Sequence, residues 1–198
     1  MATAVNPSTL AGISIGSSVS SVAEWLRRIT VRVIGSGGSQ GSGVVWHSDG
    51  LIMTNAHVAI AALHEVELPD GTRLEASLVA RDPKIDLAAL AVNAHNLATA
   101  SVRSAQTVRA GEVIIAVGNP SDGIGAVSTG IVHHAVGNSR WLMADIRLAP
   151  GNSGGPLADA KGNVLGINSM VVGGFGCAVT SDTVEEFLKN KVGLAEAV

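Results

Sequence analysis

The sequence contains one cysteine, Cys177, in 198 residues. No disulfide can form within one chain, so packing and hydrogen bonds alone must hold the fold. This fits a cytosolic protein, or an exported bacterial protein that does without disulfides. Charged residues are also few, at 15%, whereas 46% of the residues are hydrophobic. That balance excludes an intrinsically disordered chain, and the length predicts one compact unit or two small ones.

An excess of positive charge is missing as well. Lys and Arg number 13 against 16 Asp and Glu, which gives a formal net charge of -3. Binding to nucleic acid needs a basic stripe that neutralises phosphates, and the sequence shows none. We therefore expect no nucleic-acid partner.

Long apolar runs are absent too. The longest aliphatic runs, 58–63 and 87–92, are far shorter than the ~20 residues that a helix needs to cross a bilayer. Residues 1–21 have neither the basic nor the apolar region of a signal peptide. We expect a soluble globular protein without a membrane span. Its location is the cytoplasm, or the bacterial periplasm or cell envelope if an export signal has been removed.

Glycine, in contrast, is abundant, with 24 residues and no three-residue period, which predicts many tight turns. Short runs with β-branched residues alternate with turn signals such as 48–50 and 69–71. This spacing favours an all-β barrel or sandwich. The predicted strands are 29–34, 43–47, 51–55, 65–68, 72–81, 87–92, 112–118, 126–136, 140–148, 155–157, 164–172 and 177–179.

A helix is predicted at each end of this strand-rich region. Ser21 and Glu24 form a capping-box pattern before an apolar face, which predicts a helix over 21–28. A second helix is predicted to start at Asp182. The stretch 93–111 has few large apolar residues and divides the strands into two halves. We expect a flexible leader over 1–20, an N-terminal barrel over 21–108 and a C-terminal barrel with the last helix over 109–198.

The strongest chemical signal is the segment 150–157, Pro-Gly-Asn-Ser-Gly-Gly-Pro-Leu. Glycines on both sides can hold Ser153 on a tight turn with its hydroxyl exposed. The N–H groups of Gly151 and Ser153 could then stabilise an oxyanion, by about 2.7–4 kcal/mol for each donor. A serine hydroxyl is a weak nucleophile and needs a base, which in turn needs an orienting group. The alternative interpretation is an ordinary glycine-rich hairpin turn.

Two other segments could supply those groups. His57 follows an apolar strand, and a histidine at a strand end can act as a general base near neutral pH. Asp86 precedes the apolar strand 87–92 and could fix a histidine tautomer through its Nδ1–H. The alternatives are a structural histidine and an aspartate in a turn.

No metal site is expected. His133 and His134 are neighbours on a predicted strand, so their side chains would point to opposite faces, and no acidic cluster is present. Cys177 lies in an apolar strand context that disfavours a thiolate, so we expect it to pack in the core or a pocket wall.

In this order, the three segments closely resemble the sequence blocks of chymotrypsin-fold serine proteases, and among them the HtrA/Deg branch. The resemblance covers about residues 20–190. It implies an all-β fold of two six-stranded antiparallel β-barrels with short N- and C-terminal helices. It also implies a serine endopeptidase that hydrolyses peptide bonds in unfolded or misfolded proteins and needs no cofactor. The matching blocks are Thr54-Asn55-Ala56-His57-Val58, Asp86-Leu87-Ala88-Ala89-Leu90 and Gly151-Asn152-Ser153-Gly154-Gly155-Pro156-Leu157.

The resemblance also implies a role for each matching residue. His57 is the general base and acid, Asp86 is the orienting carboxylate and Ser153 is the nucleophile that forms the acyl-enzyme. Gly151, Asn152 and Ser153 form the oxyanion loop. A further set of residues is expected to bind the substrate: Leu148, Asn168, Ser169 and Met170.

No acidic residue lies in those substrate-binding stretches, so we expect cleavage after small to medium aliphatic residues. Secreted digestive proteases of this fold carry Asp where this chain has Asn152, and that Asp pairs with a newly cut amino terminus. Asn152 cannot form this ion pair, so activation by zymogen clipping is not expected. Control of activity would lie in the order of the loop 148–152.

Two further expectations follow from the family. HtrA proteins usually carry PDZ domains after the protease domain, and we expect none in this chain, which ends at Val198. Family members are often trimers, so the segment up to about Ile29, including Trp25, is a candidate homotrimer interface. The alternative is a helix packed on its own barrel. The alternative function is a catalytically silent chaperone or scaffold that binds unfolded polypeptide.

Overall fold

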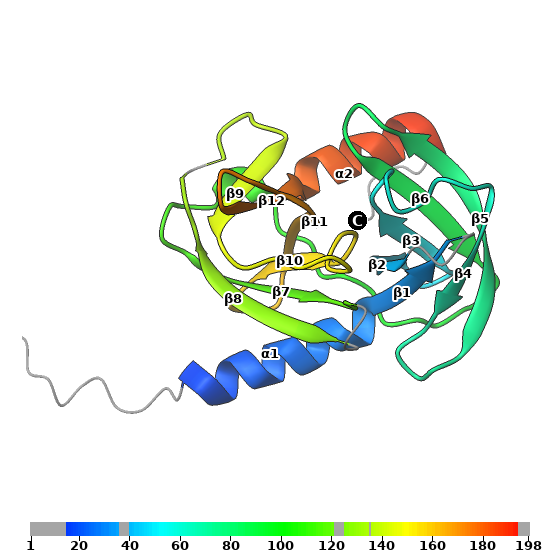
Figure 1. The fold of residues 1–198 in the computed structure, drawn as a ribbon, viewed down its shortest axis with the longest axis horizontal. Coiled ribbons are helices and arrows are strands. Elements are labelled where there is room, and N and C mark those ends of the chain that lie inside the picture. Colours follow the sequence, from blue (N-terminus) through cyan, green and yellow to red (C-terminus); the bar gives the residue numbers. More distant parts are fainter. Residues whose placement is uncertain (1–14, 36–39, 121–124, 135, 194–198) are drawn as a thin grey trace, which may run out of the picture.

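The computed structural model describes residues 15–35, 40–120, 125–134 and 136–193. It confirms an all-β fold of two closed, six-stranded antiparallel barrels with a helix near each end of the chain (Figure 1). The strand order is β1-β2-β3-β6-β5-β4 in the first barrel and β10-β11-β12-β9-β8-β7 in the second.

The bounds of the elements are as follows. The first barrel contains β1 (Thr30–Ile34), β2 (Gln40–His47), β3 (Leu51–Thr54), β4 (Leu63–Glu67), β5 (Arg73–Asp82) and β6 (Leu87–Val92). The second contains β7 (Val113–Gly118), β8 (Ala126–Val132), β9 (Trp141–Asp145), β10 (Pro156–Asp159), β11 (Val164–Val172) and β12 (Phe175–Thr180). The helical segments are α1 (Ile15–Ile29), the 3₁₀ turn η2 (Ala105–Thr107), α2 (Ser181–Phe187) and the π-helical turn η3 (Leu188–Val192).

Every strand predicted from the sequence is present, and the largest differences are at strand ends in the second barrel. β8 ends at Val132 and β9 ends at Asp145, so both are shorter than the sequence predicted. After β9 the N–H of Ile146 donates to the carbonyl of Ala144. This local bond turns the chain away from the sheet and toward the loop that carries Ser153.

Helix α1 begins earlier than the sequence predicted. It starts at Ile15, so Ser21 lies inside the helix and the prediction of a cap at Ser21 was wrong. Residues 15–20, which the sequence predicted as part of a flexible leader, are helical, and the rest of that leader, 1–14, lies outside the described residues. The Gly- and Ser-rich start has low intrinsic helix propensity. Val19 and Val22 pack against the core, and this packing stabilises the early turns. No helix among the described residues is long and apolar enough to cross a membrane.

Three hydrophobic clusters form the core, one inside each barrel and one between them. The cluster between the barrels combines Leu26 of α1, Met53 of β3, Ile115 of β7 and Phe187 of α2. These side chains are almost fully buried. Burial of this size contributes about 1.5–3 kcal/mol for each large side chain, so the two barrels are packed firmly against each other.

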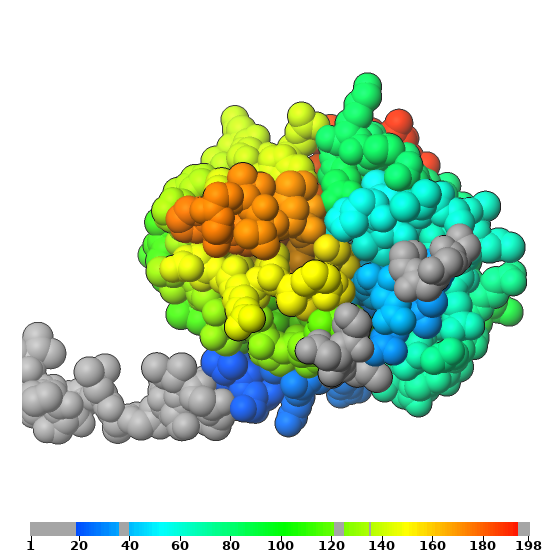
Figure 2. All heavy atoms as spheres, in the orientation of Figure 1, coloured from blue at the N-terminus to red at the C-terminus, as the bar shows by residue number. Residues whose placement is uncertain are grey.

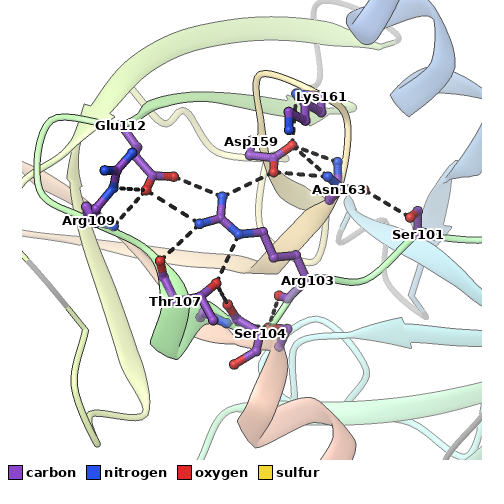
Figure 3. A network of polar contacts seen from close by, with 11 residues as sticks. Ser101, Arg103, Ser104, Thr107, Arg109, Glu112, Asp159, Lys161 and Asn163 are labelled. Atoms are coloured by element: carbon purple, nitrogen blue, oxygen red, sulfur yellow. Dashed lines mark hydrogen bonds and ion pairs between the residues drawn. The ribbon is translucent and has the colours of Figure 1, made fainter.

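The chain between the barrels is fastened to the second barrel by a polar network around Arg103 (Figure 3). The Arg103 guanidinium lies 2.9 Å from a carboxylate oxygen of Glu112 and 3.3 Å from one of Asp159. Asp159 also accepts hydrogen bonds from the N–H groups of Lys161 and Asn163. The hydrogen bond from Arg103 is the largest cause that lowers the pKa of Glu112 to about 2.

Candidate active site

His57 and Asp86 lie at the same edge of the first barrel. His57 follows β3 and Asp86 precedes β6, and these strands are antiparallel neighbours with Thr54 opposite Ala88. The Nδ1 atom of His57 is 2.9 Å and 3.0 Å from the two carboxylate oxygens of Asp86. The backbone N–H of His57 donates to the same carboxylate at 3.1 Å. This contact fixes the orientation of the imidazole and favours the tautomer with a proton on Nδ1.

Hydrogen bonds fix the turns that carry this pair. The side-chain amide of Asn55 donates to the backbone carbonyl of Asp86 at 3.0 Å, and Arg81 donates to the carbonyl of Ala56 at 2.8 Å. The backbone of Asp86 is left-handed, with φ of 55°, a conformation that aspartate tolerates better than most residues. These bonds within the first barrel fix the backbone that carries the pair.

Ser169 of β11 connects Asp86 to the second barrel. Its hydroxyl donates to the second carboxylate oxygen of Asp86 at 2.5 Å. Burial by itself would raise the pKa of Asp86, but the hydrogen bonds from His57 and Ser169 outweigh this effect and lower the pKa below its ordinary value. Asp86 is therefore an anion at neutral pH, and it can stabilise a protonated imidazole.

Ser153 lies in the loop before β10 and contacts Ser169, the residue that also contacts Asp86. Its hydroxyl donates to the backbone carbonyl of Ser169 at 2.9 Å, so Ser169 contacts both Ser153 and Asp86. Among the described residues, no hydrogen bond joins Ser153 to His57. The Ser153 hydroxyl would have to leave the Ser169 carbonyl to reach an imidazole nitrogen.

Main-chain hydrogen bonds hold the loop around Ser153. The N–H of Gly155 donates to the carbonyl of Asn152, and the N–H of Gly154 donates to that of Asn168 in β11. Gly151 has φ of 99°, a conformation that glycine adopts without strain. Within the described part of the chain, the N–H groups of Gly151 and Ser153 have no hydrogen-bond acceptor. Both are therefore available to a ligand oxygen.

The cavity beside Ser153 has a volume of about 330 Å³. A separate cavity of about 390 Å³ lies on the first barrel, away from Ser153. Figure 2 shows the loop of Ser153 (yellow) at the surface between the barrels, with the hairpin of β11 and β12 (orange) beside it. Leu148, Ser169 and Met170, three of the four residues predicted to bind substrate, line the cavity beside Ser153. Asn168 does not, because its fully buried amide donates to the carbonyl of Pro156. The other lining residues are Ala149, Pro150, Ser153 and Val171.

Two other sequence predictions concern sulfur and metals. Cys177 is 4% exposed, and burial raises the pKa of its thiol, which agrees with a packing role. Among the described residues, no group of three or more His, Cys, Asp or Glu side chains could hold a metal ion. His133 and His134 follow the end of β8, and their ring centroids are 5.5 Å apart.

Sequence reasoning missed three contributions to the site. It placed Ser169 in the substrate pocket but not on Asp86, and it gave Asn55 and Ser42 no role. The N–H of Ser42 donates to the carbonyl of Ser153, and its hydroxyl donates to that of Gly151. The only signal for Ser42 was its place between two glycines, 41 and 43, in the part of the chain that resembles HtrA proteins.

Comparison with known proteins places the chain in a family. The profile of the trypsin-like peptidase domain matches residues 41–167, and the chain belongs to this family. It is 36% identical over 165 residues to the putative serine protease HhoB of Synechocystis, a match that covers 76% of this chain. It is 39% identical over 148 residues to a probable periplasmic DegP-like serine endoprotease of Pseudomonas putida, covering 69% of this chain.

The structural comparison agrees. The HtrA-type protease AlgW, solved with a decapeptide, superposes with a TM-score of 0.78 at 26% identity and covers 91% of this chain and 68% of its own. These matches confirm the resemblance to HtrA/Deg proteases. The matched segments cover 39% of the Synechocystis relative and 31% of the Pseudomonas relative, so the chain spans well under half the length of these relatives.

Proposed function

We propose that this chain is a serine endopeptidase of the HtrA/Deg type that hydrolyses peptide bonds in unfolded or misfolded polypeptides. The observation that carries the proposal is the contact of the His57 Nδ1 with the Asp86 carboxylate, which Ser169 connects to Ser153. The His57 imidazole contacts the Asp86 carboxylate, and Ser169 links this carboxylate to the Ser153 hydroxyl across the two barrels. This combination of groups supports acyl transfer.

In the proposed reaction, His57 accepts the proton of the Ser153 hydroxyl as its oxygen attacks the scissile carbonyl carbon. The N–H groups of Gly151 and Ser153, on either side of Asn152, donate to the resulting oxyanion. His57 then gives the proton to the leaving amine, and the C–N bond breaks to leave an acyl-enzyme. A water molecule, deprotonated by His57, releases the acid and restores Ser153. Asp86 remains an anion throughout and stabilises the imidazolium.

A catalytically silent chaperone or scaffold is the second candidate. The hydrogen bond from the Ser153 hydroxyl to the Ser169 carbonyl, rather than to His57, favours it. A hydroxyl turns about a single bond within nanoseconds, so binding of a substrate can redirect it. For this reason the endopeptidase remains the main proposal.

The cavity beside Ser153 supports the substrate preference expected from the sequence. Its walls include Leu148, Met170 and Val171, and none of the described residues that line it is charged. An apolar pocket of this kind favours small to medium aliphatic residues at the cleaved position and penalises a charged one. A peptide library dominated by Arg or Lys at that position would contradict this preference. A substrate strand could pair with β11 near Ser169 and Met170 by β-augmentation.

Assembly and location are also part of the proposal. We infer a homotrimer that uses the N-terminal segment up to Ile29, although α1 also contacts its own barrel. Trp25 lies against Gly162, and Arg27 donates to the carbonyl of Gly125. A relative named as periplasmic supports a location in the cell envelope. Light scattering on the purified chain measures the assembly, and a monomer would contradict the trimer.

Labelling with a fluorophosphonate probe, together with casein hydrolysis, tests the function. Ser153→Ala is expected to abolish labelling and to lower kcat by a factor of about 10⁴–10⁶, with an unchanged circular dichroism spectrum. Ser101→Ala, which alters an exposed serine on the linker, is the matched control and should keep full activity. Wild-type protein that binds casein without cutting it would favour the silent chaperone. Full activity of Ser153→Ala would show that another group is the nucleophile.

A further inference from the structure

We propose that Ser42 is a positioning residue that holds the oxyanion loop in place from the opposite barrel. The inference rests on the proposed function, because it concerns the donors that would stabilise the oxyanion. Ser42 lies in β2 of the first barrel and is fully buried. The loop 149–155 belongs to the second barrel, so any bond between the two crosses the interface.

Every polar group of Ser42 forms a hydrogen bond, and three of its four bonds reach the second barrel. Its hydroxyl donates to the carbonyl of Gly151 at 2.7 Å and accepts from the N–H of Asn119 at 2.8 Å. Its N–H donates to the carbonyl of Ser153 at 2.8 Å, and its own carbonyl accepts from Thr54 at 2.7 Å. Ser42 therefore fixes two carbonyls of the loop and the N–H group of Asn119, which follows β7.

These two carbonyls flank the oxyanion donors. The Gly151 carbonyl belongs to the peptide that follows the Gly151 N–H, and the Ser153 carbonyl to the peptide that follows the Ser153 N–H. Peptide groups are planar, so fixing a carbonyl fixes the plane next to each donor. The orientation of both N–H groups is thereby restricted.

The side chain of Asn152 does not fix the oxyanion loop through a hydrogen bond from its oxygen. Asn152 is 4% exposed, and within the described part of the chain its side-chain oxygen has no hydrogen-bond partner. Gly151, Gly154 and Gly155 of the same loop have no side chain to contribute. Besides main-chain bonds within the second barrel and the bond from the Ser153 hydroxyl to the Ser169 carbonyl, the hydrogen bonds that hold the loop among the described residues are those from Ser42.

Loss of the Ser42 hydroxyl would leave the Gly151 carbonyl and the Asn119 N–H without this partner in a buried place. The loop would then move to find other partners, and the Gly151 N–H would move with it. Loss of one oxyanion donor costs about 10²–10³ in kcat, and a displacement of 1 Å can cost about 10². A displaced donor should therefore lower kcat by about 10- to 100-fold, and KM should stay within about twofold.

The test compares Ser42→Ala with Ser181→Ala in the full chain. Ser181 is a matched control, because its buried hydroxyl also bonds one backbone carbonyl, that of Arg103, and one backbone N–H, that of Ala105. Both variants lose the same atoms, but only Ser42 contacts the oxyanion loop. We measure kcat and KM on a peptide substrate, and the inhibition constant of a peptide aldehyde, whose tetrahedral adduct places an oxyanion in the site.

For Ser42→Ala we expect kcat and the affinity for the aldehyde to fall together by 10- to 100-fold, while Ser181→Ala keeps wild-type values. A Ser42→Ala variant with wild-type kcat and aldehyde affinity overturns the inference, even if its melting temperature falls. An equal loss in both variants also overturns it, since that would reflect lost stability. If Ser42→Ala does not fold, Ser42→Cys, which keeps the size but weakens the hydrogen bonds, should lower kcat at least threefold, and unchanged kcat overturns the inference.

These outcomes are distinct from failure of the proposed function. Absence of fluorophosphonate labelling and of turnover in the wild-type chain would refute the endopeptidase and this inference with it. Turnover that depends on Ser153 but not on Ser42 would refute this inference alone.

Discussion

Replacement of Arg103 by alanine should destabilise the fold without touching the candidate active site. The Arg103 side chain is 29% exposed, and its partners Glu112 and Asp159 are 18% and 7% exposed. Exposed ion pairs contribute about 0–1 kcal/mol, whereas breaking a fully buried pair costs about 3–5 kcal/mol. The Arg103 network is partly buried and lies between these two cases, so we expect the free energy of unfolding to fall by about 2 kcal/mol. For a chain of this size that is a fall of about 4–8 °C in melting temperature.

This loss should depend on pH in a defined direction. The hydrogen bond from Arg103 is the largest cause that lowers the pKa of Glu112 from 4.5 to about 2. Burial by itself would raise the pKa of Asp159, but hydrogen bonds from Asn163, Lys161 and Arg103 outweigh this effect and lower it. At pH values below about 4.5, the carboxylates of the unfolded chain therefore bind protons more readily than those of the folded chain. The stabilisation is complete above about pH 4.5 and is lost as the pH falls toward 2.

Thermal unfolding followed by circular dichroism between pH 7 and pH 2.5 measures both effects. The gap between wild type and Arg103→Ala should be largest at pH 7 and should shrink below pH 4.5. Arg103→Lys is the matched control, because it keeps the charge but loses the planar guanidinium that reaches two carboxylates. Its melting temperature should lie between those of the wild type and Arg103→Ala. A gap that stays constant over the whole range, or no gap at pH 7, would refute this account of the network.

Two further predictions concern the site itself. Ser169→Ala removes the hydroxyl that donates to Asp86; a hydrogen bond to a charged group is worth about 1.5–3 kcal/mol, so kcat should fall about tenfold or more, and steady-state kinetics with an unchanged kcat would contradict this role. Gly154→Ala should lower the free energy of unfolding in urea by about 2 kcal/mol more than Gly71→Ala, because forcing extra atoms into a packed site costs about 1–3 kcal/mol. Both glycines have positive φ, but a methyl group at Gly154 would overlap the Ser42 carbonyl, whereas one at Gly71 meets nothing within 4 Å. Equal losses would show that conformational strain alone accounts for the effect.

The strands and the order of the reactive residues could be predicted from the sequence because their signals are local. Each strand is a short run with β-branched residues bounded by turn residues, and β6 and β11 have the bounds that the sequence predicted. Likewise, His57, Asp86 and Ser153 each lie in a short block of distinctive neighbours. Such a local pattern can be recognised without information about contacts with the other barrel.

The beginning of α1 could not be predicted in this way. Its first turns lie in a Gly- and Ser-rich segment with low helix propensity. Packing of Val19 and Val22 against the core stabilises them, and this core exists only after the barrels have formed. The cap pattern at Ser21 was a local signal that tertiary packing overrode.

The roles of Ser42 and Ser169 escaped prediction for a related reason. The hydroxyl of Ser42 and the carbonyl of Gly151 are 109 positions apart in the sequence, and the hydroxyl of Ser169 and Asp86 are 83 apart. Serine is common and unremarkable in a sequence, and its neighbours along the chain do not indicate a partner at that separation. Only the packing of one barrel on the other brings these atoms together.

The distribution of the site over two barrels explains why such bonds matter. Local hydrogen bonds fix His57 and Asp86 to the first barrel, and main-chain bonds fix the Ser153 loop to the second. Each half is thus rigid by itself, but neither determines the distance between imidazole and hydroxyl. That distance is set by the core between the barrels and by the two serines whose bonds cross the interface. Since about 1 Å of displacement can cost a factor of about 10² in rate, residues other than His57, Asp86 and Ser153 determine whether these three reactive groups act together.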